Sequence, residues 1–188
     1  MKKVFSKLLG YYRRNFWSLE KQARHAGVKM GKGCRIKCRF WSSEPYLISL
    51  GNDVGIANGV KCLTHGGALA ARHKMPQFDV FGKVTIGNNV YFGANVLVMP
   101  GVTIGDNVLI AGGSVVTKSI PRDAVVGGTP AKYLCSIEDY IERNIPYNTD
   151  TYGMDNSEKK KILLSLPDEK FVQKPYMKID DKRLFDSK

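Results

Sequence analysis

The chain has no apolar stretch of the 18 or more residues that a membrane-spanning helix needs. Its first residues resemble a signal peptide, but Lys7, Arg13 and Arg14 interrupt the apolar segment that such a peptide requires, so secretion is not expected. The four cysteines include no CxxC pair, which favours small buried thiols in a reducing cytosol over a disulfide or a metal site. These absences indicate a cytoplasmic protein.

Acidic residues are scarce near the N-terminus. Residues 1–50 hold 12 Lys and Arg but only 2 acids, and the whole chain carries a net charge of +12. Apolar residues at 3-to-4 spacing predict a basic amphipathic helix over residues 3–26. This helix can cap the open end of a repeat structure, or it can also rest on an anionic membrane leaflet. Nucleic-acid binding is not expected, because no known binding module accompanies the charge.

A period of six residues organises the stretch from Ile86 to Ile120. Across six successive hexads the first and fifth positions are apolar in eleven of twelve cases, Ser114 being the exception. Gly, Asn and Asp return at corner pairs such as Gly87-Asn88 and Gly105-Asp106, where they accept tight turns and positive φ at low cost. The pattern predicts a parallel β-helix in which three six-residue sides close an 18-residue coil.

The same period continues upstream with two interruptions. Leu50, Ile56 and Cys62 keep the phase, whereas Met30 and Ile36 lie two residues out of register, which indicates an insertion in residues 42–46. Residues 66–82 contain no hexad and are expected to form a loop outside the coil, called the excursion below. A long loop on a rigid scaffold is more often functional than not.

The C-terminal part has a different composition. Short helices are expected at residues 137–145 and 157–166, followed by a surface extension over the last twenty residues. The expected organisation is a capping helix, a β-helix with its excursion, and a helical extension, over residues 1–27, 28–132 and 133–188.

Four segments carry a resemblance to a known family. They are EKQARHAGVKMGKGCRI at 20–36, CLTHGG at 62–67, FGKVTIGNNVYFG at 81–93, and PGVTIGDNVLIAGGSVVTKSIP with the following GGTPAK up to residue 132. Together they resemble the hexapeptide-repeat acyltransferases, and within them the O-acetyltransferases that modify sugars and bacterial surface polysaccharides.

The resemblance implies an all-β solenoid, a left-handed parallel β-helix with an N-terminal capping helix and short C-terminal helices. It also implies a homotrimer with active sites between subunits, acetyl-CoA as the acetyl donor, and a saccharide acceptor that is free or lipid-linked. No metal is expected.

Acetyl transfer to a hydroxyl needs a general base, and the chain has three histidines. The resemblance assigns this role to His65, where the hexads stop, with His73 as the rival and His25 expected on the surface. Relatives of this type often read THDGG, whereas this chain reads THGG. The group that orients the imidazole must therefore come from elsewhere, and a backbone carbonyl and Asp79 are the candidates.

The resemblance also implies binding residues for both substrates. For the coenzyme they are Tyr91, Ala94, Gly112, Thr117, Lys118 and Lys132. For the acceptor they lie in the excursion and are Arg72, His73, Lys74 and Asp79.

Three other functions remain open from the sequence. The acceptor can be an amino sugar, serine or an antibiotic, since an amine and a hydroxyl use the same base. A hexapeptide carbonic anhydrase would need all three histidines as zinc ligands. A non-catalytic scaffold would use the same solenoid without chemistry.

Overall fold

A computed structural model of the chain describes residues 2–176, with the side chains of residues 8–176. The chain forms two compact units, the first ending at Tyr140 and the second beginning at Ile141. In the described residues no helix is both long and apolar enough to cross a membrane.

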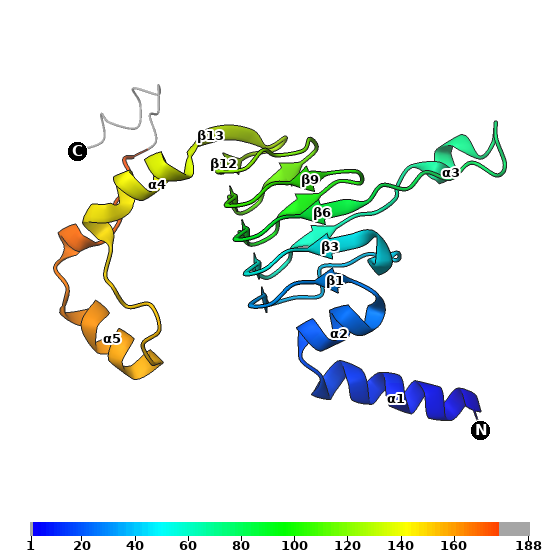
Figure 1. Ribbon diagram of the computed structural model, residues 1–188, viewed down its shortest axis with the longest axis horizontal. Coiled ribbons are helices and arrows are strands. Elements are labelled where there is room, and N and C mark those ends of the chain that lie inside the picture. The colour runs from blue at the N-terminus through cyan, green and yellow to red at the C-terminus, as the bar shows by residue number, and fades with distance from the viewer. Residues whose placement is uncertain (1, 177–188) are drawn as a thin grey trace, which may run out of the picture. The chain divides into compact units, whose positions relative to one another are not determined.

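The first unit contains three sheets of short strands. The coils that supply these strands are stacked on one another, as Figure 1 shows. One sheet has the order β1-β3-β6-β9, the second β13-β12-β10-β7-β4-β2, and the third β11-β8-β5. The strands are β1 (Lys29–Met30), β2 (Arg35–Ile36), β3 (Ile48–Leu50), β4 (Gly55–Ile56), β5 (Lys61–Cys62), β6 (Val84–Ile86), β7 (Tyr91–Phe92), β8 (Leu97–Val98), β9 (Thr103–Ile104), β10 (Leu109–Ile110), β11 (Val115–Val116), β12 (Ala124–Gly127) and β13 (Lys132–Ser136).

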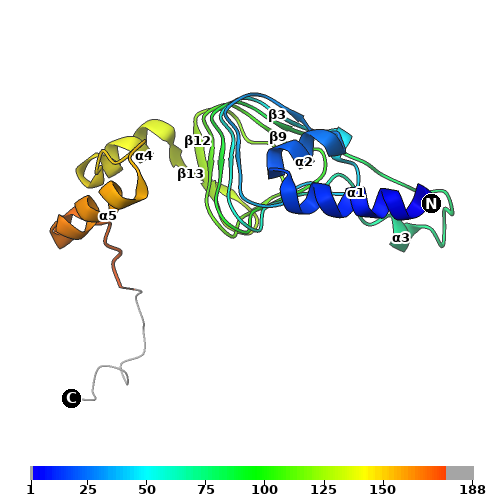
Figure 2. The ribbon, with the colours of Figure 1, turned by 90° about the horizontal axis from the view of Figure 1, so that it is seen from below.

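Strand pairing confirms the predicted parallel stacking. From β3 to β11 the chain visits the three sheets in turn, three times over. Thr85 pairs with Thr103 and Leu97 with Val115, in each case 18 residues apart, as three hexads per coil require. Figure 2 shows the coils superposed when viewed from below.

Both interruptions of the period lie where the sequence indicates them. Lys29 pairs with Ser49, 20 residues away, so the coil that contains the short 3-10 helix Pro45–Leu47 is two residues longer than a regular coil. Ser49 pairs with Thr85, 36 residues away, so residues 66–82 are inserted without loss of register. The excursion carries the one-turn helix α3 (Ala68–Ala71) and projects from the stack in Figure 1.

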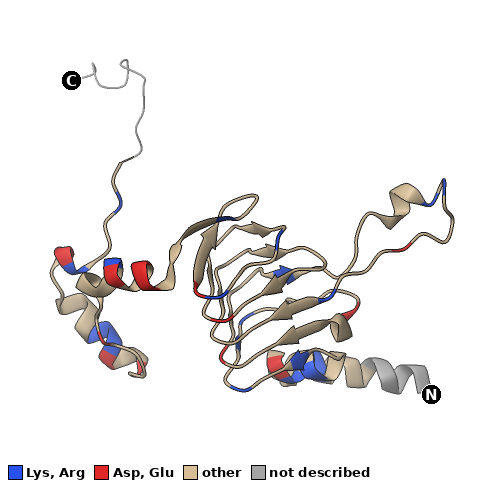
Figure 3. Ribbon diagram, turned by 45° about the horizontal axis from the view of Figure 1, so that its top comes forward, with Lys and Arg blue, Asp and Glu red and all other residues tan. Residues whose placement is uncertain are grey.

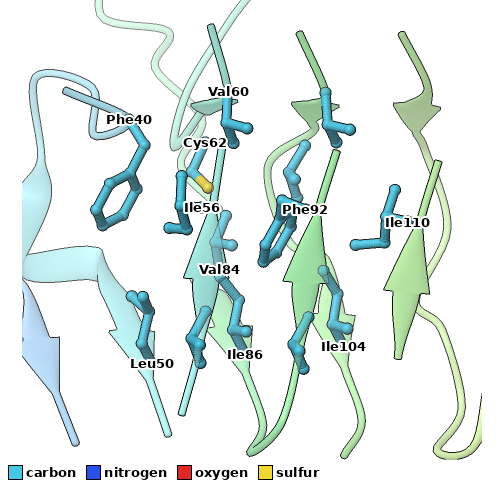
Figure 4. Packing of buried hydrophobic residues seen from close by; sticks show 14 of the residues in the cluster. Phe40, Leu50, Ile56, Val60, Cys62, Val84, Ile86, Phe92, Ile104 and Ile110 are labelled. Carbon is cyan, nitrogen blue, oxygen red and sulfur yellow. The ribbon is translucent and has the colours of Figure 1, made fainter. Parts of the chain in front are cut away.

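The inward positions of the hexads form the core. The six first positions from Ile86 to Val116 are at most 3% exposed, and equivalent residues such as Ile56, Phe92 and Ile110 lie in a row across successive coils in Figure 4. The polar exception, Ser114, is fully buried, donates to the carbonyl of Ala111 (2.6 Å) and accepts from the N–H of Gly128 (3.1 Å). Its hydroxyl is therefore satisfied, and the core tolerates it.

The corners differ from the expectation in one detail. Positive φ falls on the third corner residue, such as Asn89 (54°) and Asn107 (57°), and not on the pair before it. The first residue is glycine for a different reason: a Cβ at Gly87 would lie 2.8 Å from the carbonyl carbon of Gly105 in the next coil. Side-chain hydrogen bonds then join Asn89 to Asn107 (3.0 Å) and Asn107 to Asp123 (2.7 Å) across the coils.

The prediction of one continuous helix over residues 3–26 is wrong. Two helices form, α1 (Lys2–Phe16) and α2 (Leu19–Ala26), because the hydroxyl of Ser18 accepts from the N–H of Lys21 and begins a new helix. The cap is α2: its Ala23 is fully buried in the core, and the helix contacts β2 and the 3-10 helix of the first coil.

Two strands close the C-terminal end of the stack. Strand β12 extends the second sheet and β13 pairs with it antiparallel. The predicted helices agree within a residue with α4 (Ile137–Asn144) and α5 (Asn156–Ser165), and two single-turn 3-10 helices follow them (Ile145–Tyr147 and Asp168–Lys170). Most of the predicted surface extension, from residue 177 onward, lies outside the described residues.

Candidate active site

His65 lies at a corner of the solenoid, three residues beyond β5, where the excursion begins. The N–H of Gly82 donates to the carbonyl of Thr64 (2.8 Å), and His65 forms an antiparallel bridge with Phe81. The two ends of the loop are thus joined, and the rigid stack fixes the backbone of His65.

A chain of hydrogen bonds connects the imidazole to residues of the preceding coil. Glu44 Oε2 is 2.7 Å from His65 Nδ1 and accepts from Thr64 Oγ1 at 2.6 Å. Ser42 Oγ is 2.6 Å from the same Thr64 oxygen. Because the hydroxyl of Thr64 donates its only proton to Glu44, the hydroxyl of Ser42 is the donor in its bond to Thr64.

These contacts determine the ionisation of Glu44 and the tautomer of His65. The hydrogen bond from Thr64, and after it that from His65, lower the pKa of Glu44 against the opposing effect of burial. A carboxylate can only accept, so Nδ1 of His65 carries a proton, and in the neutral ring Nε2, on the far side, keeps its lone pair. The imidazole is 41% exposed and lines a pocket, so the ring is accessible to a substrate.

A pocket of about 340 Å³ lies beside the imidazole. Gly66 and Gly67 line it, and a Cβ on either would meet nothing within 4 Å, so the space next to the base is open. Arg72 and Asp79 also line it and form an ion pair (3.2 Å) that spans two parts of the excursion. The pocket therefore offers a base, a guanidinium and room for a substrate.

Other residues expected at this site lie elsewhere. His73 does not line the pocket, and its Nδ1 is 2.7 Å from the carbonyl of Ala70, which accepts from it; Lys74 is exposed on the same loop. His25, on α2, is exposed as expected. Asp79 does not orient His65, because its carboxylate faces Arg72.

Glu44 was not expected at this site, although the sequence contains a signal for it. His65 lies one coil after residues 42–46, the segment that the shifted period marks as an insertion. Glu44 is the only acid in that segment. Continuing the register across the insertion would have placed its carboxylate at the corner of His65.

The residues expected to bind the coenzyme lie on three parts of one chain. Thr117 and Lys118 follow β11 as Leu63 and Thr64 follow β5, so they lie on the same edge as His65, two strand spacings or about 10 Å away. Ala94 and Gly112 are exposed at the next corner, where the N–H of Gly113 donates to the carbonyl of Ala94 (2.8 Å).

Lys132 and Tyr91, the other two residues expected to bind the coenzyme, lie on different parts of the fold. Lys132 begins β13, just after Ala131, whose N–H donates to the carbonyl of Val115 (2.8 Å). Tyr91 lies on another face: it lines a separate groove of about 510 Å³ over the second sheet, together with Arg35, Lys37 and Asp53. One chain therefore does not bring Tyr91 and His65 into one pocket.

The cysteines are free thiols. Cys34 and Cys62 occupy inward positions and are buried, as predicted. Burial, followed by the nearby Cys38, raises the pKa of Cys62 to about 12. This thiol stays protonated, so it cannot serve as a nucleophile beside His65.

Comparisons with known proteins agree with this architecture. Residues 83–118 match the family model "Bacterial transferase hexapeptide (six repeats)". The chain is 45% identical over 168 residues to Protein CapG of Staphylococcus aureus, covering 87% of this chain and 94% of the relative.

Two further proteins are similar over shorter stretches. The chain is 36% identical over 136 residues to the galactoside O-acetyltransferase of Escherichia coli (strain K12), covering 70% of this chain and 64% of the relative. A solved structure of a galactoside acetyltransferase in complex with coenzyme A superposes with a TM-score of 0.51 at 24% identity, covering 75% of this chain and 83% of that one, which supports the fold. The chain belongs to the hexapeptide-repeat acetyltransferase superfamily, with relatives in its sugar O-acetyltransferase branch.

Proposed function

We propose that this chain transfers an acetyl group from acetyl-CoA to a saccharide hydroxyl in the biosynthesis of a surface polysaccharide. The observation that carries the proposal is the Glu44–His65 pair at the mouth of an open pocket, with Nδ1 occupied and Nε2 available. The similarity to a galactoside O-acetyltransferase supports a sugar acceptor.

In the proposed reaction His65 acts first as a base and then as an acid. Nε2 takes the proton of the acceptor hydroxyl while its oxygen attacks the thioester carbonyl. The tetrahedral intermediate collapses with cleavage of the C–S bond, and the imidazolium returns the proton to the departing thiolate. Glu44 stabilises the positive charge that the ring carries between these steps.

The acetyl donor is proposed to lie along the stacked coils. Thr117 and Lys118 share the edge of His65 and suit the part of the coenzyme that leads to the thioester, while Ala94 and Gly112 allow a close approach to the backbone. Lys118 and Lys132 are exposed cations suited to phosphate oxygens.

We also propose that the solenoid is left-handed and that three chains form a ring with active sites between subunits. If Tyr91 walls the thioester site, it must come from the neighbouring chain, because it lies on a different face from His65 of its own chain. Repeated head-to-tail contacts of this kind can close into a ring.

Mixing two inactive variants tests the shared site. His65→Ala and Tyr91→Ala chains, unfolded and reassembled together in equal amounts, should recover about a quarter of the wild-type activity, because one interface in four pairs an intact His65 with an intact Tyr91. Acetyl transfer is compared with each variant reassembled alone. Mixed trimers that stay as inactive as the separate variants would place both residues in one chain's site or remove Tyr91 from it.

A panel of acceptors tests the reaction itself. Thiol release from acetyl-CoA should accelerate with sugars and oligosaccharides that carry free hydroxyls. An amino sugar, serine or an antibiotic as the only accepted substrate would redirect the proposal to another acceptor, and no release with any acceptor would favour a scaffold.

Helix α1 has exposed aromatic and basic residues that suit contact with a membrane surface. In its described part Tyr11, Tyr12 and Phe16 are more than half exposed and lie beside Arg13 and Arg14. We propose that α1 contacts an anionic membrane at the inner, cytoplasmic face, where it would meet a lipid-linked acceptor. Co-sedimentation with anionic vesicles, repeated after deletion of residues 1–16, tests this contact.

A further inference from the structure

A third pocket lies between the two N-terminal helices and the first coil. Its volume is about 200 Å³, and its lining includes three arginines and two tryptophans: Arg13, Arg14, Arg39, Trp17 and Trp41. None of the lining residues is acidic. Figure 3 shows Lys and Arg gathered on the helices at this end of the stack.

No described carboxylate pairs with the three arginines of this pocket. Among the side chains that the structure describes, Arg13, Arg14 and Arg39 take part in no ion pair. Two of them lie over aromatic rings instead: Arg13 is 5.3 Å from the ring centre of Trp17, and Arg39 is 5.3 Å from that of Trp41. Such packing holds the guanidinium groups in place without cancelling their charge.

Two buried N–H groups on residues that line the pocket have no acceptor among the described residues. They are Arg13 Nε and Trp41 Nε1, both buried, and Trp41 as a whole is only 7% exposed. His25 does not supply a negative group: Arg13 Nη1 lies 2.7 Å from its Nε2, and since arginine only donates, that nitrogen is the acceptor. Buried donors without partners are rare in folded proteins.

We propose that this pocket binds a phosphate or diphosphate group. Several guanidinium groups around one space match the geometry of phosphate oxygens better than that of a single carboxylate. The pocket is smaller than the roughly 300–1,000 Å³ of sites for drug-sized ligands, so it suits a compact anion or headgroup. The inference does not depend on acetyl transfer.

The pocket contains its own reporter, because Trp17 and Trp41 are the only tryptophans of the chain. Full-length protein is titrated with inorganic pyrophosphate at constant ionic strength, and tryptophan emission is followed. In a parallel arm the titrant is vesicles of phosphatidylglycerol and phosphatidylcholine, with pure phosphatidylcholine vesicles as the reference. A saturable change with pyrophosphate identifies a free phosphate-bearing ligand, and a change only with phosphatidylglycerol identifies a lipid headgroup; both support the proposal.

Charge-removal variants distinguish anion binding in this pocket from non-specific binding to the basic surface of the protein. Arg13→Gln with Arg39→Gln should weaken binding about tenfold or more, since each loses charged hydrogen bonds. The matched control, Lys159→Gln with Lys160→Gln on α5, removes the same charge from an exposed helix and should bind like the wild type.

Arg14→Gln is a milder variant on the exposed side of α1, for use if the double variant folds poorly by circular dichroism. The proposal is overturned if neither titrant changes the emission, or if the arginine variants bind as tightly as the lysine control.

Discussion

Replacing His65 with alanine should lower kcat for acetyl transfer by about 10²- to 10⁴-fold, the usual contribution of a general base. The KM for acetyl-CoA should change little, because the imidazole acts on the acceptor proton. The fold should survive, since the ring is 41% exposed and Glu44 keeps its hydrogen bond from Thr64. Steady-state kinetics and thermal melting measure the two effects separately.

Added imidazole gives this prediction a second readout. The alanine variant leaves a space beside an open pocket of about 340 Å³, which a free imidazole can enter. Partial recovery of the rate is expected, and a purely structural histidine would show none. If His73→Ala carried the large loss and His65→Ala kept its rate, the base would be His73 and the proposed site would be wrong.

Replacing Glu44 should lower kcat by about 10- to 100-fold, because the imidazolium would lose its carboxylate and the ring its fixed tautomer. Glu44→Gln keeps an oxygen that can accept from Nδ1 and removes only the charge, so it should lose less than Glu44→Ala. Without the negative charge the protonated ring is less stable, so the acid limb of the pH–rate profile should move to lower pH in Glu44→Gln.

The pH profile distinguishes positioning from a loss of stability. In the wild type the pKa of Glu44 is lowered, so its contribution to folding is present above its ordinary range and is lost only as the pH falls through the depressed value. Loss of activity above that depressed value is therefore not caused by protonation of Glu44. Glu142→Gln, an exposed carboxylate on α4, is the matched control. An unchanged acid limb in Glu44→Gln would show that Glu44 does not act through His65.

Distance along the chain explains why the sequence predicted the base but not its partner. His65 is marked locally, by the end of the hexads and the two glycines that follow. Glu44 lies 21 residues earlier, in a segment that breaks the period. Only the parallel stacking, in which Trp41 bridges to Cys62, places the two side chains at one corner.

The hexad pattern alone predicts the repeat: the 18-residue coil, the buried first and fifth positions, the insertion near Glu44 and the excursion at 66–82. It could do so because each hexad buries its apolar residues against the equivalent hexads of neighbouring coils, so the pattern that predicts the fold is local and recurs. The tertiary structure decided what depends on neighbours outside the repeat. It made α2 the cap of the stack, with Ala23 buried in the core, and it separated Tyr91 from His65 by placing them on different faces of the coil.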